Sequence, residues 1–475
     1  MRTGILFLSA AVCLAAQTIE PQKLKEDLTI LYAALQEGHP GIYRYTPKPQ
    51  LDAVFAHAAA QIDHPMTALE FFRIASPAVA VLKCGHTRLR PPEQIENRLF
   101  DSMPLLPIDV RILSGKVFVF RDLTDGKLAG AEILAINGVT SAKLLATMLA
   151  NVGGDGDTPT AGPNRLGQSH LFRIGLYAYS NIEPPYRIEY RLHGKMGVAN
   201  MDGTSTTKAR ELDVTRYPED DRPKFGATYR FDGKTSTGVL RVYQFGGSAE
   251  DGKPLQQFFQ QSYEDLDRRH ARNLIIDVRD NGGGEDELGK LLFSYLVTEP
   301  FPYYNDLAIN KLTFDFFRYV DHPRPLPENA VEKRPNGKYL LNSHPNWGIQ
   351  KPGTPHFAGN VYALMNGGSF STTCEFLSTL HYHRRAVFIG EEAAGGYYGN
   401  TSGPGTMLVL PNSKVRIYVR LMTYYMAIPG EEHGKRSIPP DHPLTYTIDE
   451  MLDHKDKEMA EAYRLIESAN AAKPR

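Results

Sequence analysis

The sequence has no strong excess of charge and no composition that marks a fibrous or disordered chain. Its formal net charge is -1, so nothing in it attracts nucleic acid or an anionic membrane. Its 42% hydrophobic and 23% charged content is that of an ordinary folded protein. At 475 residues it exceeds what one hydrophobic core serves, which favours about two or three domains. The expected partners are therefore peptides, proteins or small molecules.

Long apolar runs are also absent after the N-terminus. The run at 5–16 follows a single Arg and ends in small residues before Gln17, the pattern of a short export signal. No later run approaches the roughly 18 residues that a membrane-spanning helix needs. We predict a signal peptide at 1–16 and an exported protein, periplasmic or extracellular, without a stable membrane span. Lipid modification at Cys13 is less favoured because Val12 before it is bulky.

Cysteine is scarce. Removal of the signal peptide leaves Cys84 and Cys374, in a compartment where a disulfide is chemically allowed. No group of His, Cys and Asp has the sequence spacing of metal ligands, so we predict no metal and no cofactor.

Changes of pattern divide the rest of the chain into four regions. Helical periodicity predicts an N-terminal helical cap at 17–95. Short β-branched runs predict a β-rich module at 96–195, and a polar stretch predicts a connector or loosely paired hairpin at 196–235. Apolar strands alternate with helical runs at 236–475, which indicates an α/β layer structure with its site at strand ends. Within it, 300–355 lacks a clear period and is predicted to be an insertion over the surface, facing substrate.

One strand-to-helix junction carries three glycines. The run NLIIDVRDNGGG ends a predicted buried strand and places Gly282, Gly283 and Gly284 before a helix. Such a loop aims backbone N–H groups at an oxyanion or a phosphate, and the helix start adds partial positive charge. A tight turn that needs positive φ explains the same glycines.

The other junction, NGGSFSTTCEF at 366–376, is crowded with hydroxyl and thiol groups. A helix that begins near Ser371 or Thr372 places these groups where its dipole favours developing negative charge. One of them is a candidate nucleophile, and ordinary N-capping is the alternative.

A serine nucleophile needs a base. No lysine occurs between Arg385 and Lys414, which excludes an amine base closely downstream. Upstream, LKCGHTRL offers His86, although a lone loop histidine is more often structural.

The segments LKCGHTRL, TGVLRVYQF, NLIIDVRDNGGG, VYALMNGGSFSTTCEF, FIGEEAAGGYYGN and IPPDHPL resemble, in order and spacing, the C-terminal (tail-specific) processing serine peptidases. They are most similar to the branch of the tricorn core protease and the repeats of interphotoreceptor retinoid-binding protein. The resemblance implies a crotonase-type (ClpP-like) α/β catalytic domain with a preceding PDZ-like module, to which AEILAINGV at 131–139 is similar.

The resemblance also implies roles. The lysine that serves the processing branch as base, about 25 residues after the serine, is absent, whereas the G-H-[ST] histidine of the tricorn-like branch matches His86. The nucleophile is then Ser371, with Thr372 and Ser369 as alternatives, because Thr372 has the family spacing of three residues before Glu375. The oxyanion donors are backbone N–H groups of Gly283, Gly284 and Thr372.

The acid that orients His86 is less defined, because KRSIPPDHPL lacks a Glu at the matching place. The candidate is Glu432, with Glu431, Asp441 and Glu375 as alternatives. The glycine-flanked tyrosine pair is expected either to shape a substrate pocket or to form a packed turn; the candidate binding residues are Tyr397, Tyr398 and Asn400.

The resulting hypothesis is an exported serine endopeptidase that uses a Ser/His acyl-enzyme on extended or C-terminal peptide segments. The alternative is a catalytically retired peptidase fold that binds a peptide or an apolar ligand. Acyl-thioester chemistry, which this fold class also supports, fits an exported protein poorly. If His86 and Ser371 meet, Cys84 and Cys374 come close as well, either as a disulfide or as two buried thiols.

Overall fold

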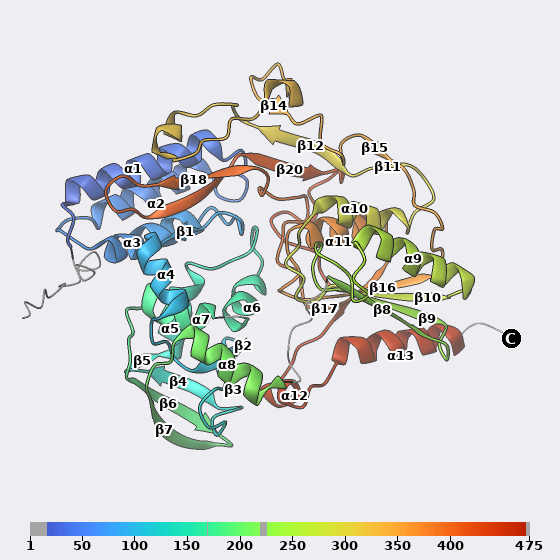
Figure 1. Cartoon of the computed structure of the whole chain (residues 1–475), viewed down its shortest axis with the longest axis horizontal. Helices are drawn as coiled ribbons and strands as arrows, with labels where there is room; N and C mark the ends of the chain where they lie inside the picture. The colour runs from blue at the N-terminus through green and yellow to red at the C-terminus, as the bar shows by residue number, and fades with distance from the viewer. Residues whose placement is uncertain (1–16, 169, 219–225, 472–475) are drawn as a thin grey trace, which may run out of the picture.

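The computed structural model describes residues 17–168, 170–218 and 226–471 (Figure 1). The predicted signal peptide at 1–16 lies outside these residues. None of the helices within the described ranges combines the length and the apolar character that crossing a membrane requires.

A six-stranded sheet in the order β21-β17-β16-β10-β9-β8 forms the centre of the C-terminal half. Its strands run parallel except β8, which pairs antiparallel with β9. All five residues of β10 are buried, because this apolar strand is covered on both faces. The strands are β8 Ala227–Asp232, β9 Thr237–Val242, β10 Asn273–Asp277, β16 Asn360–Met365, β17 Val387–Gly390 and β21 His442–Pro443.

Helices cover both faces of this sheet (Figure 1). On one face lie α9 (Leu255–Arg268), α10 (Asp286–Ser294) and α11 (Thr372–Tyr382), in one core with Leu240 and Ile276. On the other lies α13 (Lys457–Ala471), whose Ala462 and Ile466 pack with Ile275 and Leu364. The chain is thus a mixed α/β protein, and the carboxyl ends of β10 and β16 lead into the two junctions singled out in the sequence.

The segment 300–355 is more ordered than a surface excursion. Its strand β12 pairs antiparallel with β20 in a four-stranded sheet of order β13-β14-β12-β20. The strands are short, one pairing is irregular and prolines are frequent, so the sequence shows no alternating hydrophobic pattern that would predict this sheet. The elements are β11 Phe301–Pro302, β12 Tyr304–Ile309, η2 Asp315–Tyr319, η3 Glu328–Ala330, β13 Glu332–Lys333, β14 Tyr339–Leu340, β15 Ile349–Gln350 and β20 Met422–Met426.

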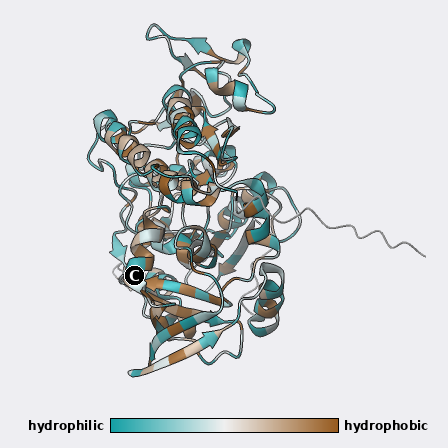
Figure 2. Cartoon of the chain, turned by 90° about the vertical axis from the view of Figure 1, so that its left-hand side faces the viewer, coloured by the Kyte–Doolittle hydropathy of each residue, from teal (hydrophilic) through white to brown (hydrophobic). Residues whose placement is uncertain are grey.

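A second, antiparallel sheet has the order β2-β3-β4-β6-β7, with β5 paired to β4. Hydrophobic and hydrophilic residues alternate along its strands (Figure 2), and the apolar face packs on helices in a core of its own. The elements are β2 Ile108–Leu113, β3 Lys116–Asp122, β4 Glu132–Ile136, β5 Val139–Thr140, α5 Ser141–Leu149, α6 Ala161–Gly167, α7 Leu171–Ala178, β6 Tyr186–Leu192 and β7 Lys195–Met201.

The predicted connector at 196–235 is wrong as a unit. Its first residues are β7, which pairs with β6, and its last are β8, which belongs to the central sheet. Between them α8 spans Thr206–Arg216. Both strands are sheet edges whose side chains are mostly exposed (β7) or only partly buried (β8), so their hydrophobic signal is weak.

The helical region near the N-terminus contains α1 (Pro21–Gly38), α2 (Lys48–Ala60), α3 (Ala68–Ala80), β1 (Leu89–Arg90) and α4 (Glu93–Asp101). Its core is completed by a hairpin from far along the chain. The strands β18 (Gly405–Val409) and β19 (Arg416–Arg420) form a sheet with β1. Leu408, Ile417 and Val419 of the hairpin lie in the same hydrophobic cluster as the helices. The cap is therefore not made by 17–95 alone. The remaining short helix, α12 (Ile448–Leu452), contacts β3.

Candidate active site

Ser371 occupies the turn between β16 and α11 in an unusual backbone conformation. Its φ is 59° and its ψ is -129°, a region that non-glycine residues rarely adopt. The Ser371 carbonyl accepts hydrogen bonds from the amides of Cys374 at 2.7 Å and Glu375 at 3.1 Å. The first turn of α11 thus holds the serine in this conformation, with its side chain only partly buried.

The other hydroxyls of this stretch fasten the helix start to the loop after β10. Ser369 Oγ donates to the Val278 carbonyl at 2.8 Å, and Thr372 Oγ1 donates to the Gly284 carbonyl at 2.8 Å. Thr373 Oγ1 donates to the carbonyl of Asn281 at 3.0 Å. Since these groups are buried and engaged, they explain the density of Ser and Thr here without chemistry.

His86 meets the remaining hydroxyl. Its Nε2 lies 3.0 Å from Ser371 Oγ. The imidazole stacks on Phe370, with 4.4 Å between ring centroids. Gly85 permits this approach, because a Cβ there would lie 2.7 Å from the Phe370 ring.

The acid next to His86 is Asp155, which the sequence reasoning missed. Asp155 Oδ2 lies 3.8 Å from His86 Nδ1, within ion-pair range but beyond a hydrogen bond. Its Oδ1 accepts a 2.8 Å hydrogen bond from the Gly85 amide. Within the described ranges, neither His86 Nδ1 nor Asp155 Oδ2 has a hydrogen-bond partner.

The loop that carries Asp155 is wedged between distant segments. The Asp155 amide donates to the Ala394 carbonyl at 3.0 Å, and the Gly156 amide donates to the Lys83 carbonyl at 2.8 Å. A Cβ on Gly154 would lie 2.1 Å from the Ala394 oxygen. The only signal in the sequence is an acid among the glycines of NVGGDGD, which is also an ordinary turn composition.

Burial and charge act against each other at this pair. Burial lowers the pKa of His86, and the Asp155 carboxylate partly offsets that effect. Burial raises the pKa of Asp155, but His86 and the Gly85 amide outweigh it and hold the pKa below its ordinary value. A neutral imidazole beside an ionised carboxylate is the state that accepts a proton from Ser371.

None of the acids predicted for His86 is near it. Glu432 is exposed and accepts a 3.4 Å hydrogen bond from Tyr398, while Glu431 is also exposed. Asp441 is exposed and accepts a 2.8 Å hydrogen bond from the Phe388 amide. These three predictions are wrong, because a search near the C-terminal motif could not find an acid on a loop from the second sheet.

Glu375 is buried but belongs to another group. It accepts a 2.7 Å hydrogen bond from Asn400 Nδ2, and Oε2 lies 2.8 Å from Tyr304 Oη. The same Tyr304 oxygen lies 2.8 Å from Asp286 Oδ2. Burial, followed by the charge of Asp286, raises the pKa of Glu375 to about 8. Glu375 therefore braces α11 against α10 and β12 rather than orienting His86.

The glycine loop lies directly against the serine. A Cβ on Gly283, where φ is 101°, would sit 2.6 Å from Ser371 Cβ. The Gly283 N–H, however, donates to Asn281 Oδ1 at 2.9 Å and is not available as an oxyanion donor. No acceptor for the amides of Gly284 and Thr372 occurs within the part of the chain that the structure describes.

The predicted substrate-binding residues pack elsewhere. Tyr397 is buried, stacks on His433 at 3.8 Å and hydrogen-bonds His381 at 2.7 Å. Tyr398 and Asn400 bind Glu432 and Glu375, as described above. The packed-turn alternative is correct, and none of the three lines the cavity beside Ser371.

The two cysteines are free and buried, so the disulfide hypothesis is wrong. Cys84 Sγ donates to the Thr401 carbonyl at 3.5 Å, whereas Cys374 Sγ accepts from the Gly395 amide at 3.1 Å. Cys84, His86 and Asp155 do bring one ligand atom each within 4.8 Å of one another. The sequence showed no such set, because Asp155 joins it only in the fold.

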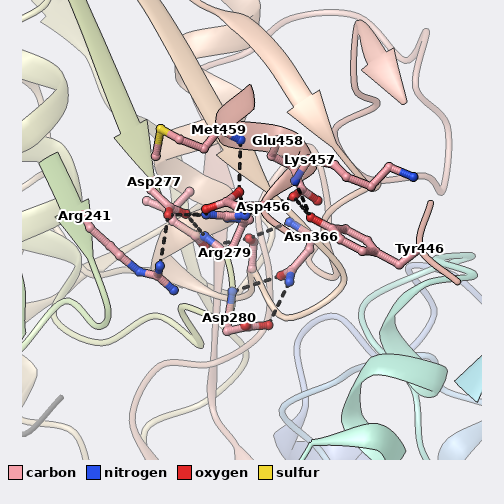
Figure 3. Close-up of polar contacts among 12 residues, drawn as sticks. Arg241, Asp277, Arg279, Asp280, Asn366, Tyr446, Asp456, Lys457, Glu458 and Met459 are labelled. Carbon is pink, nitrogen blue, oxygen red and sulfur yellow. Dashed lines mark hydrogen bonds and ion pairs between the residues drawn. The ribbon is translucent and has the colours of Figure 1, made fainter. Parts of the chain in front are cut away.

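An ion-pair cluster stabilises the base of the glycine loop (Figure 3). Arg279 donates to Asp277 at 2.7 and 2.9 Å, and also to Asp456 and Glu458 at the start of α13. Asn366 accepts from the Asp280 amide at 2.9 Å and so joins the loops after β10 and β16. The two junctions are thereby held in fixed register.

Residues 236–444 match the family model of Peptidase family S41. This segment, the S41 segment, is similar to that family. Members of this family are serine-type peptidases, and the S41 segment contains both strand-to-helix junctions.

Solved structures are similar along nearly the whole chain. Mature CPAF matches with a TM-score of 0.58 at 15% sequence identity, over 94% of this chain and 96% of that chain. Mature CPAF complexed with lactacystin gives a TM-score of 0.61 at 14% identity, over 94% and 98%. The photosystem II D1 C-terminal processing protease gives 0.41 at 14%, over 90% and 93%. At 14–15% identity the likeness to CPAF shows the fold alone, and no curated protein matches by sequence.

Proposed function

We propose that the chain is an exported serine endopeptidase in which Ser371 is the nucleophile, His86 the general base and Asp155 the acid that positions His86. The observation that carries this is the 3.0 Å approach of His86 Nε2 to Ser371 Oγ, with the carboxylate on the other side of the ring. Among the hydroxyls of the stretch at 366–376, that of Ser371 alone lies within hydrogen-bond distance of a histidine of the described residues.

The reaction follows from this geometry. His86 Nε2 takes the Ser371 proton as Oγ attacks the peptide carbonyl, which gives a tetrahedral oxyanion. The C–N bond breaks as His86 returns the proton to the leaving amine, which leaves an acyl-serine. Water, deprotonated by His86, then attacks the ester, and His86 returns that proton to Ser371 Oγ as the C–O bond breaks and the acid leaves. The 3.8 Å gap to Asp155 is expected to close when His86 is protonated, because the imidazolium attracts the carboxylate.

The oxyanion donors in this proposal are the amides of Thr372 and Gly284. Both lack an acceptor within the described part of the chain, and the dipole of α11 adds positive potential at Thr372. Gly283 is not a donor in this proposal, because its N–H already donates to Asn281 Oδ1. Its lack of a Cβ leaves room for the side chain of Ser371.

The rest of the proposal concerns substrate and location. The second sheet with α5 is assigned as a PDZ-like module, and the central sheet as a crotonase-type layer. Addition of an extended or C-terminal peptide to an exposed sheet edge gives main-chain recognition. Export rests on the signal pattern at 1–16.

Labelling with a fluorophosphonate probe tests the nucleophile. We expect the full-length protein to label, and Ser371→Ala and His86→Ala to lose labelling. Ser369→Ala and Thr372→Val remove neighbouring hydroxyls and serve as matched controls, with folding of each checked by circular dichroism. Loss of labelling in Thr372→Val but not in Ser371→Ala would shift the nucleophile by one residue. A folded wild-type protein that does not label at all would favour a binding protein that has lost catalysis.

A further inference from the structure

A cavity of about 390 Å³ opens beside Ser371 and is lined by three arginines. His86 and Phe370 stack on each other next to the serine, and Gly282 also lines the cavity. We call this cavity the basic pocket. Its lining comprises Gly85, His86, Arg88, Arg165, Gln168, Leu171, Gly282, Phe370, Ser371 and Arg420.

None of the three arginines forms an ion pair with a carboxylate of the described residues. Arg165 donates to the carbonyls of Gly153 at 2.5 Å and Gly85 at 3.3 Å, and its guanidinium lies over the Phe370 ring at 4.4 Å. These contacts use one terminal nitrogen, and the other N–H groups of the guanidinium have no acceptor among the described residues.

Arg420 is anchored in the same way. It donates to the carbonyl of Ser402 at 2.8 Å and, more weakly, to that of His86 at 3.4 Å. Arg88, by contrast, is exposed at the rim and makes no hydrogen bond or ion pair to any described residue. Two fixed guanidinium groups and one adaptable one therefore share a pocket.

The nearby acids do not neutralise this charge. Asp155 is buried behind His86 and directed at its ring and at the Gly85 amide. Asp280 accepts hydrogen bonds from Gln168 and Asn366. The arginines also repel one another: burial, followed by the charge of Arg88, lowers the pKa of Arg165 to about 10. Folding alone gives no reason to gather three positive charges here, whereas an anionic ligand does.

We propose that the basic pocket binds a carboxylate of the peptide substrate, adjacent to the scissile bond. The inference rests on the proposed peptidase function and specifies its substrate class. Carboxylate is the peptide group that matches the forked donors of arginine, and it has two sources: an Asp or Glu side chain, or the free C-terminus. Either source would place the neighbouring peptide carbonyl next to Ser371.

The test uses the full-length protein and matched fluorogenic peptides. One arm compares a Glu-containing peptide with its Gln counterpart, both amidated at the C-terminus, with the variable residue placed on either side of the cleaved bond. The other arm compares free-acid with amidated forms of a neutral peptide. The measured quantity is the ratio of kcat/KM within each pair, which we expect to be about 10-fold to 100-fold in favour of the carboxylate in one arm.

Arginine variants test whether the basic pocket causes this preference for a carboxylate. We expect Arg88→Gln to reduce it, and Arg88→Glu to reverse it in favour of a Lys-containing peptide. Arg98→Gln, on the exposed face of α4, removes the same charge outside the pocket and should leave the ratio unchanged. Raising the salt concentration should also lower the ratio, because Arg88 is exposed.

The outcomes separate this inference from the proposed function. A wild-type ratio near one in both arms, or a ratio that Arg88→Gln and Arg88→Glu leave unchanged, would overturn the carboxylate assignment. Fluorophosphonate labelling of the same samples reports the nucleophile independently of substrate. Absence of labelling and cleavage in folded wild-type protein would instead overturn the peptidase proposal on which the inference rests.

Discussion

At the scale of single residues, the decisive feature is which polar groups are already engaged. Ser369, Thr372 and Thr373 each donate to a backbone carbonyl, whereas Ser371 Oγ lies 3.0 Å from His86 Nε2, which favours Ser371 in the proposed role of nucleophile. The same reasoning removes the Gly283 amide from the oxyanion site, since Asn281 already accepts from it. Residue identity alone could not make these distinctions.

The pH dependence of activity should report the His86–Asp155 pair. Activity needs neutral His86 and so rises with pH through its pKa, which burial places below the ordinary 6.5. Asp155→Asn removes the carboxylate that raises this pKa, so we expect the acid limb of kcat/KM to move to lower pH and kcat to fall by about 10²–10⁴-fold. Asp157→Asn on the same loop is the control. An acid limb that stays in place would contradict the role of Asp155.

The buried carboxyl of Glu375 should make stability depend on pH. Its pKa is raised from 4.5 to about 8, so the folded state holds a proton that the unfolded state has lost between these values. The free energy of unfolding should therefore fall as pH rises through this window, by up to about 1.4 kcal/mol per pH unit.

Glu375→Gln keeps a neutral hydrogen-bonding group and should flatten that dependence, as measured by urea unfolding from pH 5 to 8. Exposed Glu467→Gln is the control. If the wild-type and Glu375→Gln slopes are equal, Glu375 is not protonated in the folded protein.

At the scale of elements, two strand-to-helix junctions build the site together. β10 and β16 pair in parallel, so both junctions lie at one edge of the sheet. The hydroxyls of Thr372 and Thr373 in one junction donate to glycine-loop carbonyls of the other, and the Arg279 cluster fixes the base of that loop (Figure 3). The close approach of the loops requires a residue without Cβ at position 283.

Gly283→Ala should therefore displace Ser371 and abolish most fluorophosphonate labelling. Gly138→Ala separates this steric effect from backbone strain, because Gly138 also has positive φ, 78°, but nothing lies within 4 Å of its added Cβ. We expect the control to label normally with a modest loss of stability. Equal labelling of both variants would show that the close approach to Ser371 has no catalytic consequence.

At the scale of the whole molecule, the candidate triad draws on three separate regions. His86 follows the N-terminal helices, Asp155 lies on a loop beside the second sheet, and Ser371 lies in the turn between β16 of the central sheet and α11. The hairpin β18–β19 links the first and last of these regions. It belongs to the S41 segment in sequence, but it packs into the core of the N-terminal helices (Figure 1). Arg420, at the end of β19, reaches the basic pocket.

A substitution that destabilises the packing of this hairpin should also destabilise the arrangement of the candidate active site. Ile417→Ala leaves a cavity in the helical core and is expected to cost about 2–5 kcal/mol of unfolding free energy. Labelling of Ser371 should then be lost at lower urea concentration than in wild type. Val409→Ala, at a partly buried position of the same hairpin, should cost less. An unchanged urea midpoint for Ile417→Ala would show that the hairpin does not support the site.

The sequence by itself determined the local features of this protein. The alternation of apolar strands and helices indicated an α/β layer structure, and the glycine loop and the hydroxyl-rich stretch marked two strand ends. These signals are readable because periodicity and turn chemistry are local properties of the chain. His86 and Ser371 were selected together through a resemblance that also depends on short contiguous motifs.

Only the tertiary structure decided which acid faces His86, which amides are free, and which charges share a pocket. Arg88, Arg420 and the segment that carries both Asp155 and Arg165 are far apart in sequence and meet because different cores pack against one another. The edge strands of the predicted connector and the short strands of the insertion likewise depend on their partners for identification. Contacts between distant segments leave no periodic trace in a single sequence, which is why the site's electrostatics had to come from the fold.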